Sequence, residues 1–370
     1  MRDFYLADPR ASTTQRQERE RERMGTDASV HQQEPWFVLL AILGALYVAA
    51  FVYRLLYVSG LTLCLRRAKD LRGHYGAWAV VTGPTSSIGR SMALELARRR
   101  LNLVLVGRDP TALQDISKTA SETHGVLTKT VQFDLSLVST RQGEEAMGRL
   151  REAVEGLEVG VLVNNAGLAT PHAAYLHEVD VEAWVKMIRV NLWAVTEVTA
   201  AVLPGMVERG RGAVINIGSG STEALPSYPL YSVYAATKRY VAQFSRSICI
   251  EYRGKGIDVQ CQAPLYVDTK MVTNMVNREG LFSWLTMPTS DAYANAATCW
   301  IGHRSPICMP NLSHRLQWCL IHFIPDRFIV AHRLRETLRQ RAVFQRLRAS
   351  AEGWNRRMPS AAASTASEVS

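Results

Sequence analysis

The chain has 370 residues, of which 47% are hydrophobic and 21% are charged, which excludes a wholly disordered protein and one with many membrane spans. This length allows at most two domains, and one large α/β domain with appendages fits equally well. Lysines and arginines outnumber acidic residues by 43 to 33, giving a net charge of +10. That charge suits a phospholipid surface, a phosphorylated cofactor, an acidic substrate or nucleic acid, and does not choose among them.

The N-terminal part of the chain combines a polar tail, residues 1–34, with a long apolar stretch. From Trp36 to Tyr53 there are 18 residues without a charge. A helix of this length covers about 27 Å, close to a hydrocarbon core of about 30 Å. A buried core helix would carry a polar face, and a cleaved signal peptide would begin closer to the N-terminus. We therefore expect a disordered tail followed by a transmembrane anchor at residues 35–58.

From Gly76 onward, short apolar runs alternate with amphipathic stretches. Six runs are predicted strands, at residues 78–82, 102–106, 128–133, 159–164, 213–217 and 257–262. Helical stretches lie between them, for example at residues 88–99 and 181–207. Because the strands are almost continuously apolar, they predict a doubly wound α/β fold, in which helices cover both faces of a parallel sheet. We assign this domain to residues 76–300.

The C-terminal part predicts a basic amphipathic helix. Residues 316–324 are apolar, but Pro325 ends the run before it could span a membrane. Apolar residues then recur at helical spacing among seven arginines, Arg327, Arg333, Arg335, Arg339, Arg341, Arg346 and Arg348. Such a helix suits an anionic membrane surface, so we expect residues 301–353 to be membrane-associated. The Ser/Ala-rich residues 354–370 are expected to be disordered.

The cysteines and histidines show no metal-binding or redox pattern. The six cysteines form no CxxC pair, and the chain is too long for a disulfide scaffold, so we predict buried, reduced thiols in a reducing compartment. The nine histidines form no HxxxH or HExxH motif. We therefore predict no metal site.

Polar and glycine-rich segments follow several predicted strands, at the sheet edge where doubly wound folds bind ligands. The first strand leads into TGPTSSIG, residues 82–89, a turn of the kind that places a pyrophosphate on a helix N-terminus, although an ordinary tight turn would also need glycines. The second strand ends at Gly107-Arg108, where an NAD-selective site would carry Asp or Glu. A guanidinium there suits a 2′-phosphate and favours NADP(H); a solvent-facing loop arginine is the alternative. The candidate cofactor-binding residues of these segments are Gly83, Thr85, Ser86, Ser87, Ile88, Gly89, Arg108, Asp134, Asn165, Ala166 and Gly167.

Tyr234 and Lys238 lie four residues apart in YAATK, so a helix places phenol and ammonium on one face. A free phenol titrates near ~10, and an adjacent cation stabilises the phenolate. Tyr234 could then act as general acid toward a carbonyl as hydride arrives. Ser219, after the fifth strand, could hold that carbonyl oxygen. Tyr231 has no lysine four residues on, and we expect it to line the substrate pocket.

Together these segments resemble the short-chain dehydrogenase/reductase superfamily over about residues 76–270. The resemblance rests on VVTGPTSSIG, LVNNAG, VLPGMVERGRGAVINIGSGS, YAATK and EYRGKGIDVQCQAPLYVDTKM. Within the superfamily the chain is most similar to the membrane-bound very-long-chain 3-oxoacyl-CoA reductases of fatty-acid elongation and to related 17-beta-hydroxysteroid dehydrogenases. An apolar segment before the reductase domain also matches them. The resemblance implies a Rossmann-type fold.

The resemblance also implies roles for individual residues. The catalytic tetrad falls on Asn191, Ser219, Tyr234 and Lys238. Lys238 would also hold the nicotinamide ribose, and Asn191 would support a water-linked proton relay; from sequence alone, Asn191 could equally be an exposed polar residue on a helix. Val267 and Thr269 match the segment that approaches the nicotinamide amide.

Two residues depart from the family pattern. Leu265 stands where a glycine usually follows the proline of that last segment. Ser87 stands at the middle glycine of the phosphate-binding turn, where glycine lets the backbone approach the cofactor and permits a positive φ. Serine there would either cost affinity or use its hydroxyl to bind phosphate.

The leading hypothesis is an NADPH-dependent reductase that converts long-chain 3-oxoacyl-CoA to 3-hydroxyacyl-CoA in microsomal fatty-acid elongation. A steroid or retinoid carbonyl reductase is the alternative enzyme, and a non-catalytic scaffold or sensor with the same fold is the alternative of another class. We expect acyl-CoA and membrane lipid as partners, with other elongase subunits or an oligomer as further candidates, and no nucleic acid.

The expected location is the endoplasmic reticulum membrane, with the catalytic domain facing the cytosol. Basic residues flank the apolar stretch almost evenly, so the positive-inside rule favours this orientation by a thin margin. The unpaired cysteines and the cytosolic supply of NADPH and acyl-CoA point the same way. Asn311-Leu312-Ser313 is an N-glycosylation sequon, and we predict that it is unmodified.

Overall fold

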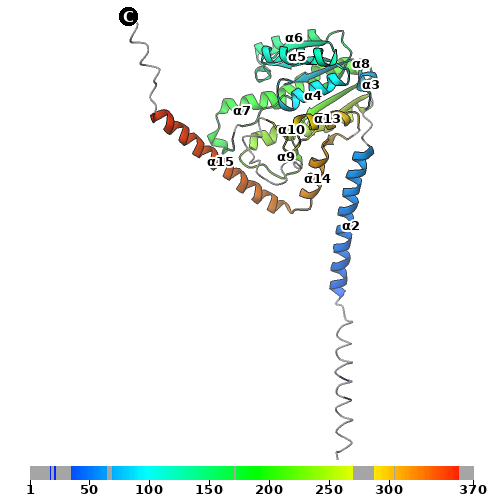
Figure 1. Ribbon diagram of the computed structural model, residues 1–370, viewed down its shortest axis with the longest axis vertical. Helices are drawn as coiled ribbons and strands as arrows, with labels where there is room; N and C mark the ends of the chain where they lie inside the picture. Colours follow the sequence, from blue (N-terminus) through cyan, green and yellow to red (C-terminus); the bar gives the residue numbers. More distant parts are fainter. Residues whose placement is uncertain are drawn as a thin grey trace, which may run out of the picture. The chain divides into compact units, whose positions relative to one another are not determined.

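The computed structural model describes residues 35–64, 69–170, 172–269, 287–303 and 305–357, together with Gln17 and Arg21 (Figure 1). The predicted tail at residues 1–34, apart from those two, and most of the predicted tail at 354–370 lie outside the described residues. The chain divides into two units, residues 1–57 and 58–370.

The first unit consists mainly of the apolar helix α2 (Pro35–Cys64). Its stretch Trp36–Tyr57 has a mean hydropathy of 2.3, and none of it is buried, which makes it a candidate membrane span. The predicted apolar helix is therefore confirmed, and it continues past residue 58. A second stretch, Val181–Glu208, also passes this test by length and composition, but half of it is buried because it forms a core helix of the second unit.

The second unit is built on a seven-stranded parallel sheet with the strand order β3-β2-β1-β4-β5-β6-β7. The strands are β1 (Trp78–Thr82), β2 (Asn102–Gly107), β3 (Thr128–Gln132), β4 (Val159–Asn164), β5 (Gly212–Ile217), β6 (Ile257–Gln262) and β7 (Ile307–Cys308). The six predicted strands are confirmed to within one residue at each end. Strand β7 was not predicted, because two residues are too short to show a hydrophobic pattern. The order changes direction between β1 and β4, where doubly wound sheets bind their ligands.

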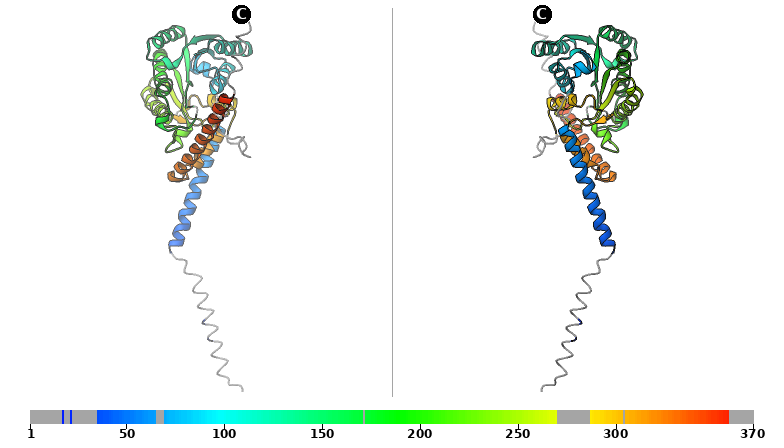
Figure 2. Two further views of the ribbon diagram at one scale, coloured as in Figure 1. Left: turned by 90° about the vertical axis from the view of Figure 1, so that its left-hand side faces the viewer. Right: turned by 90° about the vertical axis from the view of Figure 1, so that its right-hand side faces the viewer.

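Helices cover both faces of this sheet (Figure 2). The described helices that pack on it or connect its strands are α3 (Leu71–Tyr75), α4 (Ser87–Arg98), α5 (Pro110–His124), η1 (Leu135–Leu137), α6 (Arg141–Val154), η2 (Leu176–Glu178), α7 (Val181–Ile188), η3 (Arg189–Trp193), α8 (Ala194–Glu208), α9 (Gly220–Glu223), α10 (Ser232–Arg253) and α13 (Ser290–Cys299). Asp109 caps α5 by accepting from the backbone N–H groups of Thr111 (3.0 Å) and Ala112 (3.1 Å).

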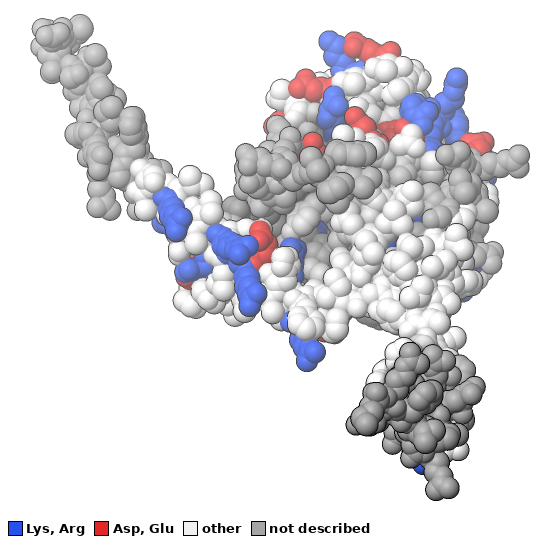
Figure 3. All heavy atoms as spheres, turned by 60° about the horizontal axis from the view of Figure 1, so that its bottom comes forward, with Lys and Arg blue, Asp and Glu red and all other residues white. Residues whose placement is uncertain are grey.

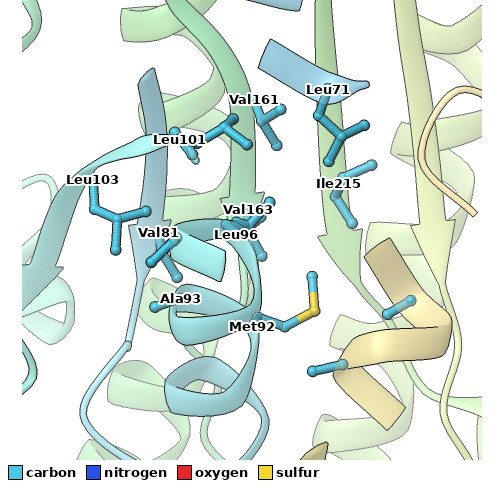
Figure 4. Packing of buried hydrophobic residues seen from close by; sticks show 14 of the residues in the cluster. Leu71, Val81, Met92, Ala93, Leu96, Leu101, Leu103, Val161, Val163 and Ile215 are labelled. Carbon is cyan, nitrogen blue, oxygen red and sulfur yellow. The ribbon is translucent and has the colours of Figure 1, made fainter. Parts of the chain in front are cut away.

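Alternating strand residues form two hydrophobic cores, one on each face. Val81 and Val163 pack with α4, α5 and α13, whereas Val80 and Leu162 pack with α6, α8 and α10. Figure 4 shows the first core, where Leu96 of α4 lies against the sheet. Full burial of such a leucine contributes roughly 1.5–3 kcal/mol, so these cores hold the strand ends in fixed positions.

Two helices follow the sheet, α14 (Leu312–Ile321) and the long α15 (Asp326–Arg357). The basic helix expected near the C-terminus is present, and Figure 3 shows arginines spaced along α15. It packs on the rest of the second unit, because Ile329 and Thr337 are buried and Phe344 stacks on His172 with ring centroids 3.7 Å apart. This helix therefore forms part of the folded domain.

Candidate active site

One cavity of about 890 Å³ lies at the carboxyl ends of the strands. Every candidate site residue except Gly89 and Asn191 lines it: Gly83, Thr85, Ser86, Ser87, Ile88, Arg108, Asp134, Asn165, Ala166, Gly167, Ser219, Tyr231, Tyr234, Lys238, Val267 and Thr269. The sequence segments chosen from different strands therefore meet at a single site.

The glycine-rich turn between β1 and α4 depends on close backbone packing. Gly83 has φ +64°, in the left-handed region that favours glycine. A Cβ on Gly89 would collide with the carbonyl of Gly83 and the side-chain amide of Asn165. The side chain of Ser86, the N-cap residue of α4, makes no capping hydrogen bond. The backbone N–H groups of the first helical turn can therefore serve an anionic ligand.

Ser87 also has a positive φ, +49°. The sequence raised the possibility that this position needs such a conformation, and the structure confirms it. An L-residue in the left-handed region costs roughly 1–2 kcal/mol relative to the right-handed helix. Ser87 therefore holds, at a cost, a backbone conformation that glycine would adopt more easily.

Asn165 positions the turn through its side-chain amide. Its Nδ2 donates to the carbonyls of Thr82 (3.1 Å) and Gly83 (3.0 Å). In return, Oγ1 of Thr82 accepts from the backbone N–H groups of Asn165 (3.0 Å) and Ala166 (3.1 Å). These bonds join the end of β1 to the end of β4. Asn165 therefore lines the cavity and also holds the glycine-rich turn in place.

Arg108 and Asp134 lie at the ends of neighbouring strands and line the same part of the cavity. Arg108 directly follows β2 and is exposed. Asp134 follows β3 and accepts from the backbone N–H of Ser136 at 2.9 Å, which caps η1. The side chain of Asp134 is therefore partly committed to local structure.

Tyr234 and Lys238 lie one turn apart on α10, and Ser219 reaches the same end of the cavity from the segment after β5. Ser219 hydrogen-bonds to the phenol of Tyr234. Its Oγ also lies 2.6 Å from Oγ of Ser221. The ammonium of Lys238 donates to the carbonyl of Ile217 at 2.9 Å.

The pKa of Tyr234 is raised, whereas an adjacent lysine was expected to stabilise the phenolate. Burial raises the pKa of Tyr234, and the nearby phenol of Tyr266 also raises it, while the hydrogen bond with Ser219 lowers it. Burial lowers the pKa of Lys238 to about 8. A phenol with a raised pKa stays protonated at neutral pH, which suits a proton donor.

Asn191 is fully buried in the π-helical segment η3, so it is not an exposed helix residue. Its amide accepts from the backbone N–H of Leu168 (2.7 Å) and donates to the carbonyl of Leu168 (2.8 Å) and to Oγ1 of Thr237 (3.0 Å). A Cβ on Gly167 would lie 3.3 Å from Nζ of Lys238 and 3.6 Å from Oδ1 of Asn191. Asn191 and Lys238 therefore both approach Gly167, and Asn191 lies in a π-helical turn of the kind that is frequent at functional sites.

The structure adds a wall that was not predicted from the sequence. Tyr228 and Tyr266 line the cavity, together with Gln317 and Ile321 of α14 and Ile324, Phe328, Ile329, His332 and Arg333 in or just before α15. The basic helix was expected to be membrane-associated, and in the structure two of its arginines contact protein or the cavity: Arg341 pairs with Glu178, and Arg333 lines the cavity. Amphipathic spacing located the helix but could not distinguish a lipid-facing arginine from one that contacts protein.

Leu265, the second departure from the family pattern, packs against the small residue that follows the catalytic serine. A Cβ on Gly220 would lie 2.8 Å from Cδ2 of Leu265 and 3.1 Å from Cε of Met309. The backbone N–H of Gly220 donates to the carbonyl of Pro264 at 2.6 Å. Leu265 thus fills the space beside the Ser219 segment and leaves that segment in place.

The cysteines whose side chains the structure describes are free thiols; Cys299 is half-exposed, and the others are buried: Cys249, Cys261, Cys308 and Cys319. This agrees with the predicted buried thiols. Among the described residues, His, Cys, Asp and Glu side chains form no cluster of three that could hold a metal ion.

Comparison with known proteins assigns the family. The family model for short chain dehydrogenase matches residues 77–280. A very-long-chain 3-oxoacyl-CoA reductase-like protein of Arabidopsis thaliana is 41% identical over 320 residues, which cover 85% of this chain and 99% of the relative. An inactive hydroxysteroid dehydrogenase-like protein 1 of Homo sapiens is 35% identical and covers 82% and 92% of the two chains.

Solved structures share the fold. A short-chain dehydrogenase from Sphingobium yanoikuyae in complex with NADPH superposes with a TM-score of 0.56 at 28% identity, covering 66% of this chain and 92% of that one. The matched residues include the glycine-rich turn, the Ser219, Tyr234 and Lys238 cluster and the strands that carry them. The chain belongs to the short-chain dehydrogenase/reductase family.

Proposed function

We propose that the protein is an NADPH-dependent reductase of long-chain 3-oxoacyl-CoA thioesters that acts in microsomal fatty-acid elongation. The observation that carries this proposal is the intact group of Ser219, Tyr234 and Lys238 at one end of a large cavity whose far wall contains Ile321, Ile324 and Phe328. The first group supplies carbonyl chemistry, and the apolar wall suits an acyl chain.

The reaction assigned to these residues is reduction of a ketone. Ser219 holds the carbonyl oxygen by a hydrogen bond, and Tyr234, kept protonated by its raised pKa, donates a proton to that oxygen. Lys238 then stabilises the phenolate that remains, since its buried ammonium lies one turn along the same helix. Asn191 orients the backbone behind Lys238 through Leu168. When a nicotinamide cofactor is bound, it supplies the hydride to the carbonyl carbon.

The chain's residues fit such a cofactor. Gly83 and Gly89 let the turn pack closely against Ala166 and Asn165, and Ser86 to Ile88 at the N-terminus of α4 line the cavity. Arg108, exposed at the cavity edge after β2, supports the choice of NADPH over NADH, because its guanidinium can pair with a 2′-phosphate. The NADPH complex of the bacterial relative supports the same choice.

Two other functions remain as alternatives to be tested. A steroid or retinoid carbonyl reductase would use the same three catalytic residues and an equally apolar wall. A non-catalytic scaffold or sensor has a precedent in the relative named as inactive, and the strain at Ser87 fits a weakened cofactor site. The presence of Ser219, Tyr234 and Lys238 in one site favours a catalyst.

A membrane setting supports the proposal. Besides the candidate span in α2, the side chains of Ile324 and Phe328 are 47% and 55% exposed while also lining the cavity, so a substrate could enter from lipid. We place the protein in the endoplasmic reticulum membrane with its catalytic domain in the cytosol, where membrane lipid and other elongase subunits would be its partners. Asn311 caps α14, its Oδ1 accepting from the N–H (2.9 Å) and Oγ (2.7 Å) of Ser313, and the cytosolic placement predicts that the sequon is unmodified.

The deciding experiment is a substrate panel with the full-length purified protein. NADPH oxidation is followed with a long-chain 3-oxoacyl-CoA, a keto-steroid and retinal, and repeated with NADH. We expect the largest kcat/KM with the acyl-CoA and NADPH, and Arg108→Ala to weaken NADPH more than NADH. A larger kcat/KM with the steroid or retinal would replace the proposed substrate, and no turnover of any of the three would favour the non-catalytic alternative.

A further inference from the structure

A cation in the substrate half of the cavity has no role in the mechanism described above. Arg333 of α15 lines the cavity on the wall that also carries Tyr228 and Tyr266. Its Nη2 donates to the hydroxyl of Tyr266 at 2.9 Å, and its Cζ lies 4.8 Å from the ring centre of Tyr228 and 5.8 Å from that of Tyr266. Two aromatic faces therefore hold the guanidinium in place.

The partners of Arg333 leave part of its donor capacity unused. Within the described chain, its Nε is buried and has no hydrogen-bond partner. Glu336, the acidic residue three positions along the helix, lies 3.9 Å from Arg339 and pairs with it. The charge of Glu336 also acts on Arg333. The hydrogen-bond and ring partners that the described chain gives this half-buried guanidinium are phenols, so it keeps donors available for an oxygen acceptor.

The guanidinium of Arg333 lies near the place where the substrate carbonyl would react. Its partner Tyr266 acts electrostatically on the catalytic Tyr234, and Tyr228 stacks on Tyr231 with ring centroids 4.9 Å apart. Arg333 thus lies on the wall adjoining the catalytic tyrosine. The helix that carries it is fixed to the domain on the far side of Arg333, where Nε of Arg341 donates to Glu178 at 3.1 Å and Phe344 stacks on His172.

We propose that Arg333 binds an acceptor oxygen of the substrate's thioester arm, and thereby selects acyl thioesters over plain ketones. In a 3-oxoacyl thioester, the thioester carbonyl lies two carbons from the ketone and is the nearest such oxygen. The phosphates of the CoA moiety are a second source of the same chemistry. This inference rests on the proposed function, because it names how that site recognises its substrate.

Three substrates that carry the same acyl chain distinguish the thioester carbonyl from the CoA phosphates as the oxygen that Arg333 binds. The full-length wild type and Arg333→Met are compared with a long-chain 3-oxoacyl-CoA, the matching 3-oxoacyl N-acetylcysteamine thioester, and a long-chain methyl ketone. We expect Arg333→Met to lower kcat/KM for both thioesters by about 10- to 100-fold, the usual weight of a hydrogen bond to a charged group, and to spare the ketone. A loss confined to the CoA thioester would keep the inference and assign the oxygen to a phosphate.

Controls separate recognition from structure. Arg335→Met removes an exposed arginine of the same helix and should leave all three substrates unchanged. Arg333→Lys should recover part of the thioester activity, and equilibrium binding of the 3-hydroxyacyl products should weaken in parallel with kcat/KM. No change in Arg333→Met, or an equal loss for all three substrates with a lower melting temperature, would overturn the inference while the proposed function stands. A wild type that reduces the ketone but neither thioester would instead remove the proposed function itself.

Discussion

The two walls of the cavity are built in different ways. The cofactor wall consists of strand ends and the turn between β1 and α4, and it is held by backbone contacts such as those of Asn165 with Thr82 and Gly83. The substrate wall consists of side chains from α14 and α15, and it is held by side-chain contacts such as those of Arg333 with Tyr228 and Tyr266.

This difference determines what each wall tolerates. Backbone packed against backbone leaves no room for a methyl group, so the cofactor wall accepts few substitutions. Side chains on a helix can be exchanged without moving the sheet, so the substrate wall can change its specificity while the catalytic residues stay in place. Substitutions on either wall can test this contrast.

The largest effect is expected where the two walls meet, at Tyr234. Tyr234→Phe removes the proton donor and little volume, so we expect turnover to fall by about 10²- to 10⁴-fold while NADPH binding is nearly unchanged. Single-turnover kinetics and fluorescence titration of NADPH measure the two quantities. Tyr231→Phe is the matched control, since it removes a hydroxyl from the same cavity, and should cost far less. Turnover retained by Tyr234→Phe would show that another group donates the proton.

On the cofactor wall, we expect a substitution at Gly89 to lower both NADPH affinity and stability. Gly89→Ala would force a methyl group into the carbonyl of Gly83 and the amide of Asn165, so we expect NADPH affinity to fall at least tenfold and stability to drop by roughly 1–3 kcal/mol. Gly148→Ala in α6 is the control, because nothing lies within 4 Å of its added Cβ, and it should stabilise the protein by up to about 1 kcal/mol. Urea unfolding and NADPH titration of both variants test the contrast. Equal behaviour of the two alanines would show that the turn is not held by backbone packing.

A lower pH should destabilise the protein through a buried histidine next to the substrate wall. His314 of α14 is fully buried, its Nε2 lies 3.0 Å from the carbonyl of Tyr266, and burial lowers its pKa to about 4. Because an unfolded histidine titrates near ~6.5, the unfolded state binds more protons between these values, and stability falls as the pH drops from about 6.5 toward 4. The loss from this group is on the order of 3 kcal/mol near pH 4.

His314→Gln provides the test of that assignment. Glutamine cannot titrate, so unfolding measured from pH 7.5 to 4.5 should show a flatter pH dependence than the wild type, even if the variant is less stable throughout. An unchanged slope would assign the acid sensitivity to other groups.

The same contrast explains how much was predictable. The six main strands and the cluster of Ser219, Tyr234 and Lys238 were predicted because each lies in a short segment whose pattern or spacing expresses its structure. The environment of Arg333 was not predicted, because it depends on contacts with residues about 70 to 100 positions away in the sequence. The raised pKa of Tyr234 was also missed, since burial is a tertiary property.

The smallest expected effect is at Ser87, where the cofactor wall departs from the family pattern. Ser87→Gly relieves an L-residue with φ +49°, a gain of roughly 1–2 kcal/mol, and glycine loses roughly 0.5–1 kcal/mol of that through the greater freedom of the unfolded chain. We therefore expect a net stabilisation of about 1 kcal/mol or less in urea unfolding, with NADPH affinity unchanged or slightly tighter. Ser86→Ala at the neighbouring position is the control. Ser86 has φ −151°, an extended conformation without strain, so this substitution should show no such gain. If Ser87→Gly instead lost NADPH affinity severalfold, its hydroxyl would be a phosphate ligand, and the cofactor wall would depend on a side chain at this position.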